Sequence, residues 1–328
     1  MAQTLLATFN ELPHVNCADM QGRCLPLLPL LDDEQSWHFW IEHGGKLMPM
    51  KAEPVESSYF ANQGKDDDLQ FLYLQFITQR AFWPDIAPLS KGMMSDLYNL
   101  ATSIAKLRVL HAASQNGVET ARMAATELEY IFLTCRAVFD ILQETVAKLW
   151  KRVELCDKSI HKRALPSSFR KMLLMNDRLM SSEEIQTKYS IPENVANAYL
   201  ESSEFFLWLR QYRDNLMHGG TGFDWVYVLQ DGFGIATERR PFDTMKIWKE
   251  SNLRPNKIGS LLSAVAHIVL NTFRTVECVI IELQRIIQFP PEVAPGYNVY
   301  VCGHYIEEIG KLESYISTSP WYGMPESV

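Results

Sequence analysis

Seven apolar side chains between residues 128 and 149 follow one another at alternating steps of four and three residues. They are Leu128, Phe132, Cys135, Phe139, Leu142, Val146 and Leu149. Steps of three and four residues place side chains on one stripe of an α-helix. The sequence therefore predicts a long helix over residues 119–155 that buries one face against other elements.

Similar periodicities predict further helices, which makes a mostly α-helical chain the first expectation. The predicted helices cover residues 67–83, 93–114, 192–217, 256–288 and 306–316. Pro166 and Pro192 mark the starts of a shorter helix and of the helix over 192–217, because proline suits a first helical turn. Pro290-Pro291 ends the helix over 256–288.

Other parts of the chain lack helical periodicity. Residues 1–65 contain five prolines and the pair Gly44-Gly45, so we expect an irregular N-terminal region in which residues 37–41 form a strand or a packed turn. Asp231-Gly232 separates two runs rich in aromatic and β-branched residues and predicts a β-hairpin over 223–237. A strand is expected over 297–302. We divide the chain into an N-terminal region (1–65), a helical part (66–290) and a C-terminal tail (291–328).

Composition bounds the class of protein. The 328 residues are 47% hydrophobic and 21% charged, and the net charge is −8. This balance suits a globular protein and argues against coating nucleic acid through a broadly basic surface. The six cysteines form no CxxC pair, which favours reduced thiols in a cytoplasmic protein with no metal site and no cofactor. The uncharged run over 258–273 is too short and too polar for a membrane span, so no membrane contact is expected.

One short run carries the functional argument: Arg213-Asp214-Asn215-Leu216-Met217-His218, followed by Gly219-Gly220. Arginine holds phosphate with a planar charged fork, and histidine moves protons near neutral pH. Arg213 and His218 are five residues apart, which is about 140° around a helix, so they converge only if the helix ends at 217. Asp214 shares the face of His218 and is placed to orient it. The alternative is an ordinary basic helix end that satisfies carbonyls and the helix dipole.

This run resembles the motif of the HEPN superfamily, in which an arginine, a polar residue (most often asparagine), three variable residues and a histidine close a long helix. The resemblance covers residues 119–288, and Asp214 departs from the commoner asparagine. It implies an antiparallel helical bundle with the hairpin over 223–237 as an insertion. The expected fold class is therefore a mostly α bundle with a short hairpin and an irregular N-terminal region.

The resemblance also implies a metal-independent endoribonuclease that dimerises through its motif-bearing helices and acts as a toxin or defence effector. The ribose 2′-hydroxyl would attack phosphorus and leave a 2′,3′-cyclic phosphate and a 5′-hydroxyl. Arg213, His218 and Asp214 are the catalytic candidates. The cleft candidates are Glu129, Arg136, Asp140 and Asn215. A toxin of this kind implies an antitoxin as its partner. The alternative is a catalytically inactive module that binds a nucleotide or a protein, including a module that partners a nucleotidyltransferase.

Three further groups have two interpretations each. Arg239-Arg240, with Lys246 and Lys249, either guides RNA or forms a solvated loop. The basic stretch over 148–163 either contacts phosphate or is a polar helix end. The aromatic side chains over 205–212 are expected in the core or in a dimer interface rather than as platforms for bases.

Overall fold

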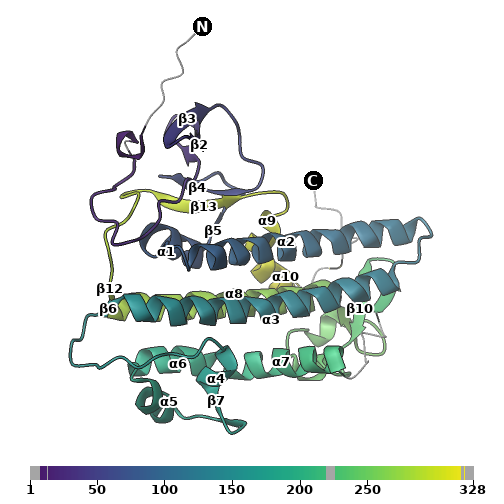
Figure 1. Ribbon diagram of the computed structural model, residues 1–328. Helices are drawn as coiled ribbons and strands as arrows, with labels where there is room; N and C mark the ends of the chain where they lie inside the picture. The colour runs from purple at the N-terminus through teal and green to yellow at the C-terminus, as the bar shows by residue number, and fades with distance from the viewer. Residues whose placement is uncertain (1–7, 13, 219–225, 319–320, 322–328) are drawn as a thin grey trace.

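The computed structural model describes residues 8–12, 14–218, 226–318 and 321, with all of their side chains except those of residues 9 and 213–218. The fold is 49% helical and 16% strand, and its largest sheet has six strands. The expectation of a mostly α-helical bundle is therefore wrong. The protein is a mixed α and β fold in which long helices pack beneath a sheet (Figure 1).

The long helices largely follow the predicted periodicities. The predicted helix over 119–155 is confirmed as α3, and the stretch predicted over 192–217 divides into two helices. The helices are α1 (Leu72–Arg80), α2 (Ala87–Gln115), α3 (Ala121–Arg152), α4 (Phe169–Leu173), α5 (Ser182–Tyr189), α6 (Glu193–Glu201), α7 (Ser203–His218), α8 (Leu261–Ile286), α9 (Glu307–Gly310) and α10 (Leu312–Thr318). Short 3-10 helices lie at Phe9–Glu11, Phe242–Thr244 and Glu250–Asn252.

The six-stranded sheet corrects the expectation of an irregular N-terminal region. Its strands are β1 (Leu30–Leu31), β2 (Trp37–His43), β3 (Lys46–Met50), β4 (Ser57–Ala61), β5 (Leu69–Gln70) and β13 (Asn298–Cys302). Their order is β3-β2-β1-β4-β13-β5, in which β1 and β4 are parallel and the other pairs antiparallel. The predicted strand over 297–302 is confirmed as β13, which lies between β4 and β5.

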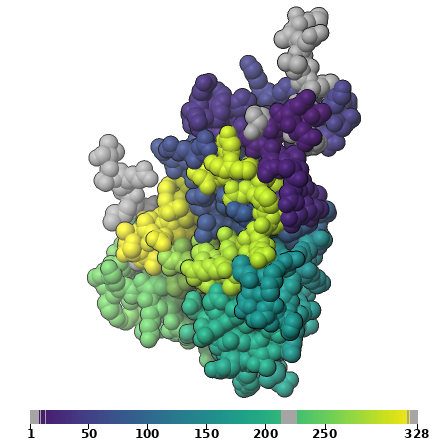
Figure 2. Space-filling view, turned by 90° about the vertical axis from the view of Figure 1, so that its left-hand side faces the viewer, coloured from purple at the N-terminus to yellow at the C-terminus, as the bar shows by residue number. Residues whose placement is uncertain are grey.

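A buried glutamine of α1 holds the segment that leads into β13. The Gln79 side chain is 1% exposed. Its amide donates to the carbonyls of Ala294 (2.9 Å) and Tyr297 (2.7 Å), and its Oε1 accepts from the Ala294 amide (2.9 Å). Figure 2 shows the yellow-green C-terminal segment lying between the N-terminal sheet and the helices. Gln79 therefore ties the segment before β13 to α1.

Three smaller sheets complete the structure. The predicted hairpin is confirmed as β9 (Val226–Leu229) and β10 (Gly232–Ala236), and β11 (Ile258–Ser260) pairs with β10 as a third strand. Because β11 occupies residues 258–260, α8 begins at Leu261 rather than at 256. Two-residue strands pair β6 (Glu154–Leu155) with β12 (Ile287–Gln288) and β7 (Leu174–Met175) with β8 (Arg178–Leu179).

The core lies between the helices, with α3 and α8 in the middle (Figure 1). By length and composition α8 could cross a membrane, but 61% of its most apolar window is buried inside the protein. Two buried polar side chains of this core are paired: the Tyr199 hydroxyl donates to Gln143 Oε1 at 2.7 Å, and Gln143 donates to the Pro166 carbonyl at 2.8 Å. Such pairing removes the cost of burying these polar atoms.

A histidine packed among aromatic rings holds the N-terminal segment against the sheet. His14 is 5% exposed, stacks on Trp40 with ring centroids 5.2 Å apart, and also faces Phe60 and Tyr297. Burial, with a smaller effect from nearby His38, lowers the pKa of His14 from 6.5 to about 4. The folded protein therefore keeps this imidazole neutral.

We expect His14 to make the protein acid-sensitive. Between pH 6.5 and 4 the unfolded chain binds a proton at His14 that the folded chain does not, so stability falls as the pH falls through this window. Replacing His14 by Phe should remove roughly 2 kcal/mol of the stability lost between pH 7 and 4.5, measured by urea unfolding. His304→Phe, at an exposed histidine, is the control. Equal acid sensitivity of the wild type and His14→Phe would contradict this expectation.

Candidate functional site

The motif lies at the C-terminal end of α7, which is a separate helix. At Ser202 the backbone leaves the α6 helix, and the Ser202 hydroxyl donates to the Tyr199 carbonyl at 3.0 Å. A new helix then runs from Ser203 to His218. The motif therefore lies at the end of a helix that begins at Ser203 rather than at Pro192.

Aromatic contacts fix α7 antiparallel to α3. Phe139 of α3 packs on Phe206 (ring centroids 5.2 Å apart), and Phe132, two turns earlier in α3, packs on Trp208 (5.4 Å) and Tyr212 (4.8 Å). Rising residue numbers along α7 therefore match falling numbers along α3. Phe206 and Leu209 of α7 are also fully buried in the hydrophobic core of the protein. The C-terminal end of α7 therefore lies opposite the first half of α3.

The catalytic candidates Arg213, Asp214 and His218, and the cleft candidate Asn215, lie within this helix, but their side chains are outside the described part of the chain. The backbone remains helical through His218, one residue beyond the expected end. Positions 213 and 218 are then about 140° apart around a regular helix. Because α7 does not end at 217, it lacks the turn that would bring positions 213 and 218 together within one copy.

The other cleft candidates belong to α3, where Arg136 and Asp140 lie at least two turns closer to the C-terminal end of the helix than Glu129. Arg136 is 14% exposed, forms an ion pair with Asp140 (Nη1 to Oδ1, 2.8 Å), and its guanidinium lies 4.9 Å from the centre of the Phe206 ring. Because Phe206 is two turns before position 213, this pair lies away from the motif. Glu129 is half-buried and lies two turns before Arg136 in α3. The antiparallel packing therefore places Glu129 level with position 213 of α7.

The basic stretch over 148–163 is largely occupied by contacts within the protein. Arg152 pairs with Asp85 (2.9 Å), Lys162 donates to the Trp150 carbonyl (2.7 Å), and Arg163 donates to the Thr187 carbonyl (2.8 Å). Cations at the C-terminal end of a helix satisfy carbonyls and the helix dipole in this way. These contacts favour the interpretation of this stretch as a polar helix end.

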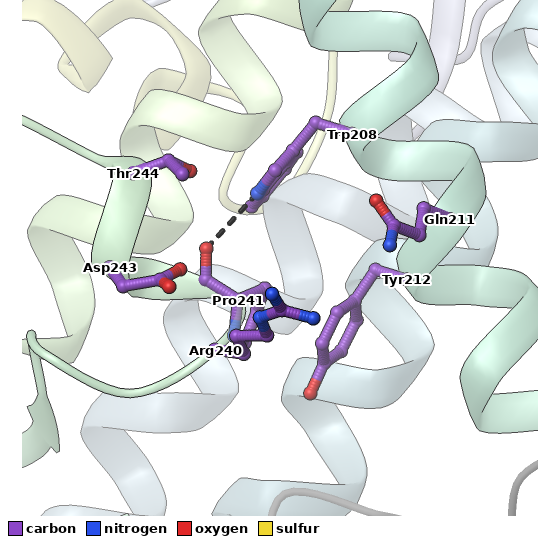
Figure 3. Close-up of a pocket in the computed structure, with 7 residues that line it drawn as sticks. All are labelled: Trp208, Gln211, Tyr212, Arg240, Pro241, Asp243 and Thr244. Atoms are coloured by element: carbon purple, nitrogen blue, oxygen red, sulfur yellow. Dashed lines mark hydrogen bonds between the residues drawn. The ribbon is translucent and has the colours of Figure 1, made fainter.

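A pocket of about 180 Å³ opens between the middle turns of α7 and the loop that follows β10. Trp208, Gln211 and Tyr212 line it from α7, and Arg240, Pro241, Asp243 and Thr244 line it from the loop (Figure 3). The Trp208 indole donates to the Pro241 carbonyl at 3.0 Å and ties the two walls together. In Figure 3 the Arg240 guanidinium extends toward the ring of Tyr212.

The sequence indicated only part of this pocket. The sequence predicts Arg240 either as a guide for RNA or as part of a solvated loop, and it predicts Trp208 and Tyr212 in the core or in a dimer interface. Gln211, Asp243 and Thr244 carried no signal, because their neighbours across the pocket belong to a distant segment. The only local hint is that Arg240 and Pro241 follow a predicted strand. The pocket arises from tertiary packing, which brings the loop against α7.

Comparisons with protein-family models, with curated proteins and with solved structures find no match to this chain.

The bond between Trp208 and Pro241 yields a testable prediction. Trp208→Phe keeps an aromatic ring but leaves the carbonyl of buried Pro241 without this donor, so we expect a loss of about 1 kcal/mol in stability. Amide hydrogen exchange at residues 242–245 should also accelerate. Trp248→Phe removes an equivalent bond to the Ser260 carbonyl (3.1 Å) outside the pocket and is the matched control. Unchanged exchange at 242–245 in Trp208→Phe would show that the bond does not hold the loop.

Proposed function

We propose that this chain is a metal-independent endoribonuclease of HEPN type. The observation that carries the proposal is the placement of the motif: Arg213 to His218 close a helix that is packed antiparallel on α3 and borders a pocket with an arginine and two aromatic side chains. A helix end of this kind can present a guanidinium and an imidazole to a phosphodiester. The proposal does not need the all-helical bundle, because only α3 and α7 position the motif.

The chemistry assigns separate roles to the two motif residues. His218 removes the proton of the ribose 2′-hydroxyl as the oxygen attacks phosphorus, and an imidazolium returns a proton to the departing 5′-oxygen. Arg213 neutralises the charge that develops on the phosphoryl oxygens. Glu129, level with position 213 across the α3–α7 contact, is the side chain we assign to positioning Arg213.

A second copy of the chain completes this site. Positions 213 and 218 lie about 140° apart on one helix, and one imidazole does not easily serve both sides of a phosphorus. A two-fold dimer through the C-terminal ends of α7 supplies a second arginine and a second histidine to one cleft. Exposed apolar side chains of the elements at this end of the molecule suit such an interface: Val109, Val118, Met123, Tyr130 and Val228.

The second candidate is an inactive module that binds a nucleotide or a protein partner. The net charge of −8 and the carboxylate of Asp214 both favour it, because each repels RNA phosphate. The two functions predict opposite results in a cleavage assay.

We expect single-stranded RNA to be cleaved in the presence of EDTA, with a 2′,3′-cyclic phosphate and a 5′-hydroxyl as products. His218→Ala and Arg213→Ala should each lower the rate by about 10²-fold or more, since a positioned acid or base contributes ~10²–10⁴. Mass spectrometry of the fragments identifies the ends. His304→Ala and Arg285→Ala, both at exposed positions, control for the loss of any histidine or arginine. Cleavage that is equal in wild type and His218→Ala would exclude the nuclease and favour the binding module.

The dimer is tested with mixed subunits. The native particle should have twice the 37.7 kDa mass of one chain by light scattering. A heterodimer of wild type and His218→Ala, isolated through two affinity tags, should be as inactive as the His218→Ala homodimer, because both histidines serve one cleft. Half of the wild-type activity would show that each subunit works alone.

A further inference from the structure

The pocket beside the motif helix has an aromatic wall that is already fixed. Phe132 packs on both Trp208 and Tyr212, and Phe205 stacks on Trp208 with ring centroids 5.8 Å apart. The indole bond to the Pro241 carbonyl holds the opposite wall. A ligand that stacks here therefore meets rings that lose little conformational freedom on binding.

The polar groups of the pocket suit a ligand with two different ends. Arg240 and Asp243 are exposed, and neither forms an ion pair with any residue in the described ranges. A guanidinium attracts phosphate and also stacks on flat rings, whereas a carboxylate repels phosphate and accepts N–H groups. Gln211 and Thr244 add further hydrogen-bonding groups. Together these side chains suit a ligand in which a ring with N–H donors is joined to a phosphate. They do not suit an anion without such a ring, because Asp243 would repel it.

The size of the pocket limits the ligand to one ring system. At about 180 Å³ it is smaller than the roughly 300–1,000 Å³ of pockets that enclose whole small molecules. Single-stranded RNA is recognised through splayed bases that stack on aromatic rings and arginine planes. A pocket of this size and lining holds one such base while the rest of the chain stays outside.

We propose that the pocket formed by Trp208, Gln211, Tyr212, Arg240, Asp243 and Thr244 binds one unpaired nucleobase of a single-stranded RNA. The base stacks on the aromatic wall, Asp243 or Gln211 accepts its N–H groups, and Arg240 holds the adjoining phosphate. The choice of RNA rests on the proposed function. The pocket borders α7 about one turn before position 213, so a base held here places a neighbouring linkage at the motif.

The test measures binding separately from cleavage. All proteins carry His218→Ala, and fluorescence anisotropy compares an eight-nucleotide single-stranded RNA with an eight-unit ribose-phosphate strand that has no bases. The base-containing strand should bind at least tenfold more tightly, because stacking and base contacts are lost in the other strand while the charge stays equal. Equal affinity for the two strands would overturn the base pocket.

Variants locate the binding in this pocket. Arg240→Ala should weaken binding of the base-containing RNA about tenfold, and Lys246→Ala, which removes the same charge from an exposed position in the same loop, should change it less than twofold. Tyr212→Leu, with its fold checked by circular dichroism, should reduce the preference for the strand with bases. Equal effects of Arg240→Ala and Lys246→Ala would overturn the pocket assignment.

Failure of this inference and failure of the nuclease are distinguishable. RNA that is cleaved in a His218-dependent way but binds without regard to its bases removes the base pocket and leaves the nuclease. Base-dependent and Arg240-dependent binding by a protein that never cleaves RNA removes the nuclease and supports the pocket as the site of the binding module.

Discussion

The antiparallel contact between α3 and α7 is the interaction on which the candidate site depends. Phe132 supports both aromatic side chains of the pocket, and Phe139 packs on Phe206 in the core. Burial of one such side chain contributes about 1.5–3 kcal/mol, and each aromatic pair adds about 0.5–1.5 kcal/mol. The same rings therefore stabilise the fold and set the register between Glu129 and the motif. A loss of this register would move the pocket and the motif together.

The long helices could be predicted from the sequence because their signal is local. The stripe from Leu128 to Leu149 repeats within a single helix, and α3 follows it. The sequence predicts β13 as a strand but not its place in the sheet, because β13 pairs Val299 with Phe60 from the other end of the chain. The prolines of the N-terminal region do not exclude strands there. Pro29 directly precedes β1, and Pro49 lies in β3, an edge strand where proline is tolerated. These prolines predict an irregular region, in which only residues 37–41, part of β2, are expected as a strand or a packed turn.

The sequence also predicted part of the candidate site, namely the position of the motif at a helix end. The sequence placed Arg213 and His218 at a helix end, and the backbone of α7 agrees with this placement. The sequence did not show which basic residues satisfy helix carbonyls and which line the pocket. Lys162 and Arg163 lie in a loop and donate to carbonyls near the C-terminal ends of α3 and α5, whereas Arg240 lies in the pocket without an ion pair in the described part of the chain. All three are basic residues in an acidic chain, and only the packing of the loop against α7 distinguishes Arg240 from the other two.

The continuity of α7 through His218 has a consequence for how the proposed enzyme would work. A helix that curled at its end could gather its own arginine and histidine, but a regular helix directs positions 213 and 218 to different sides. In a dimer with a two-fold axis beside the helix end, position 213 of one copy and position 218 of the other can face the same cleft. The straight helix end therefore favours a shared cleft.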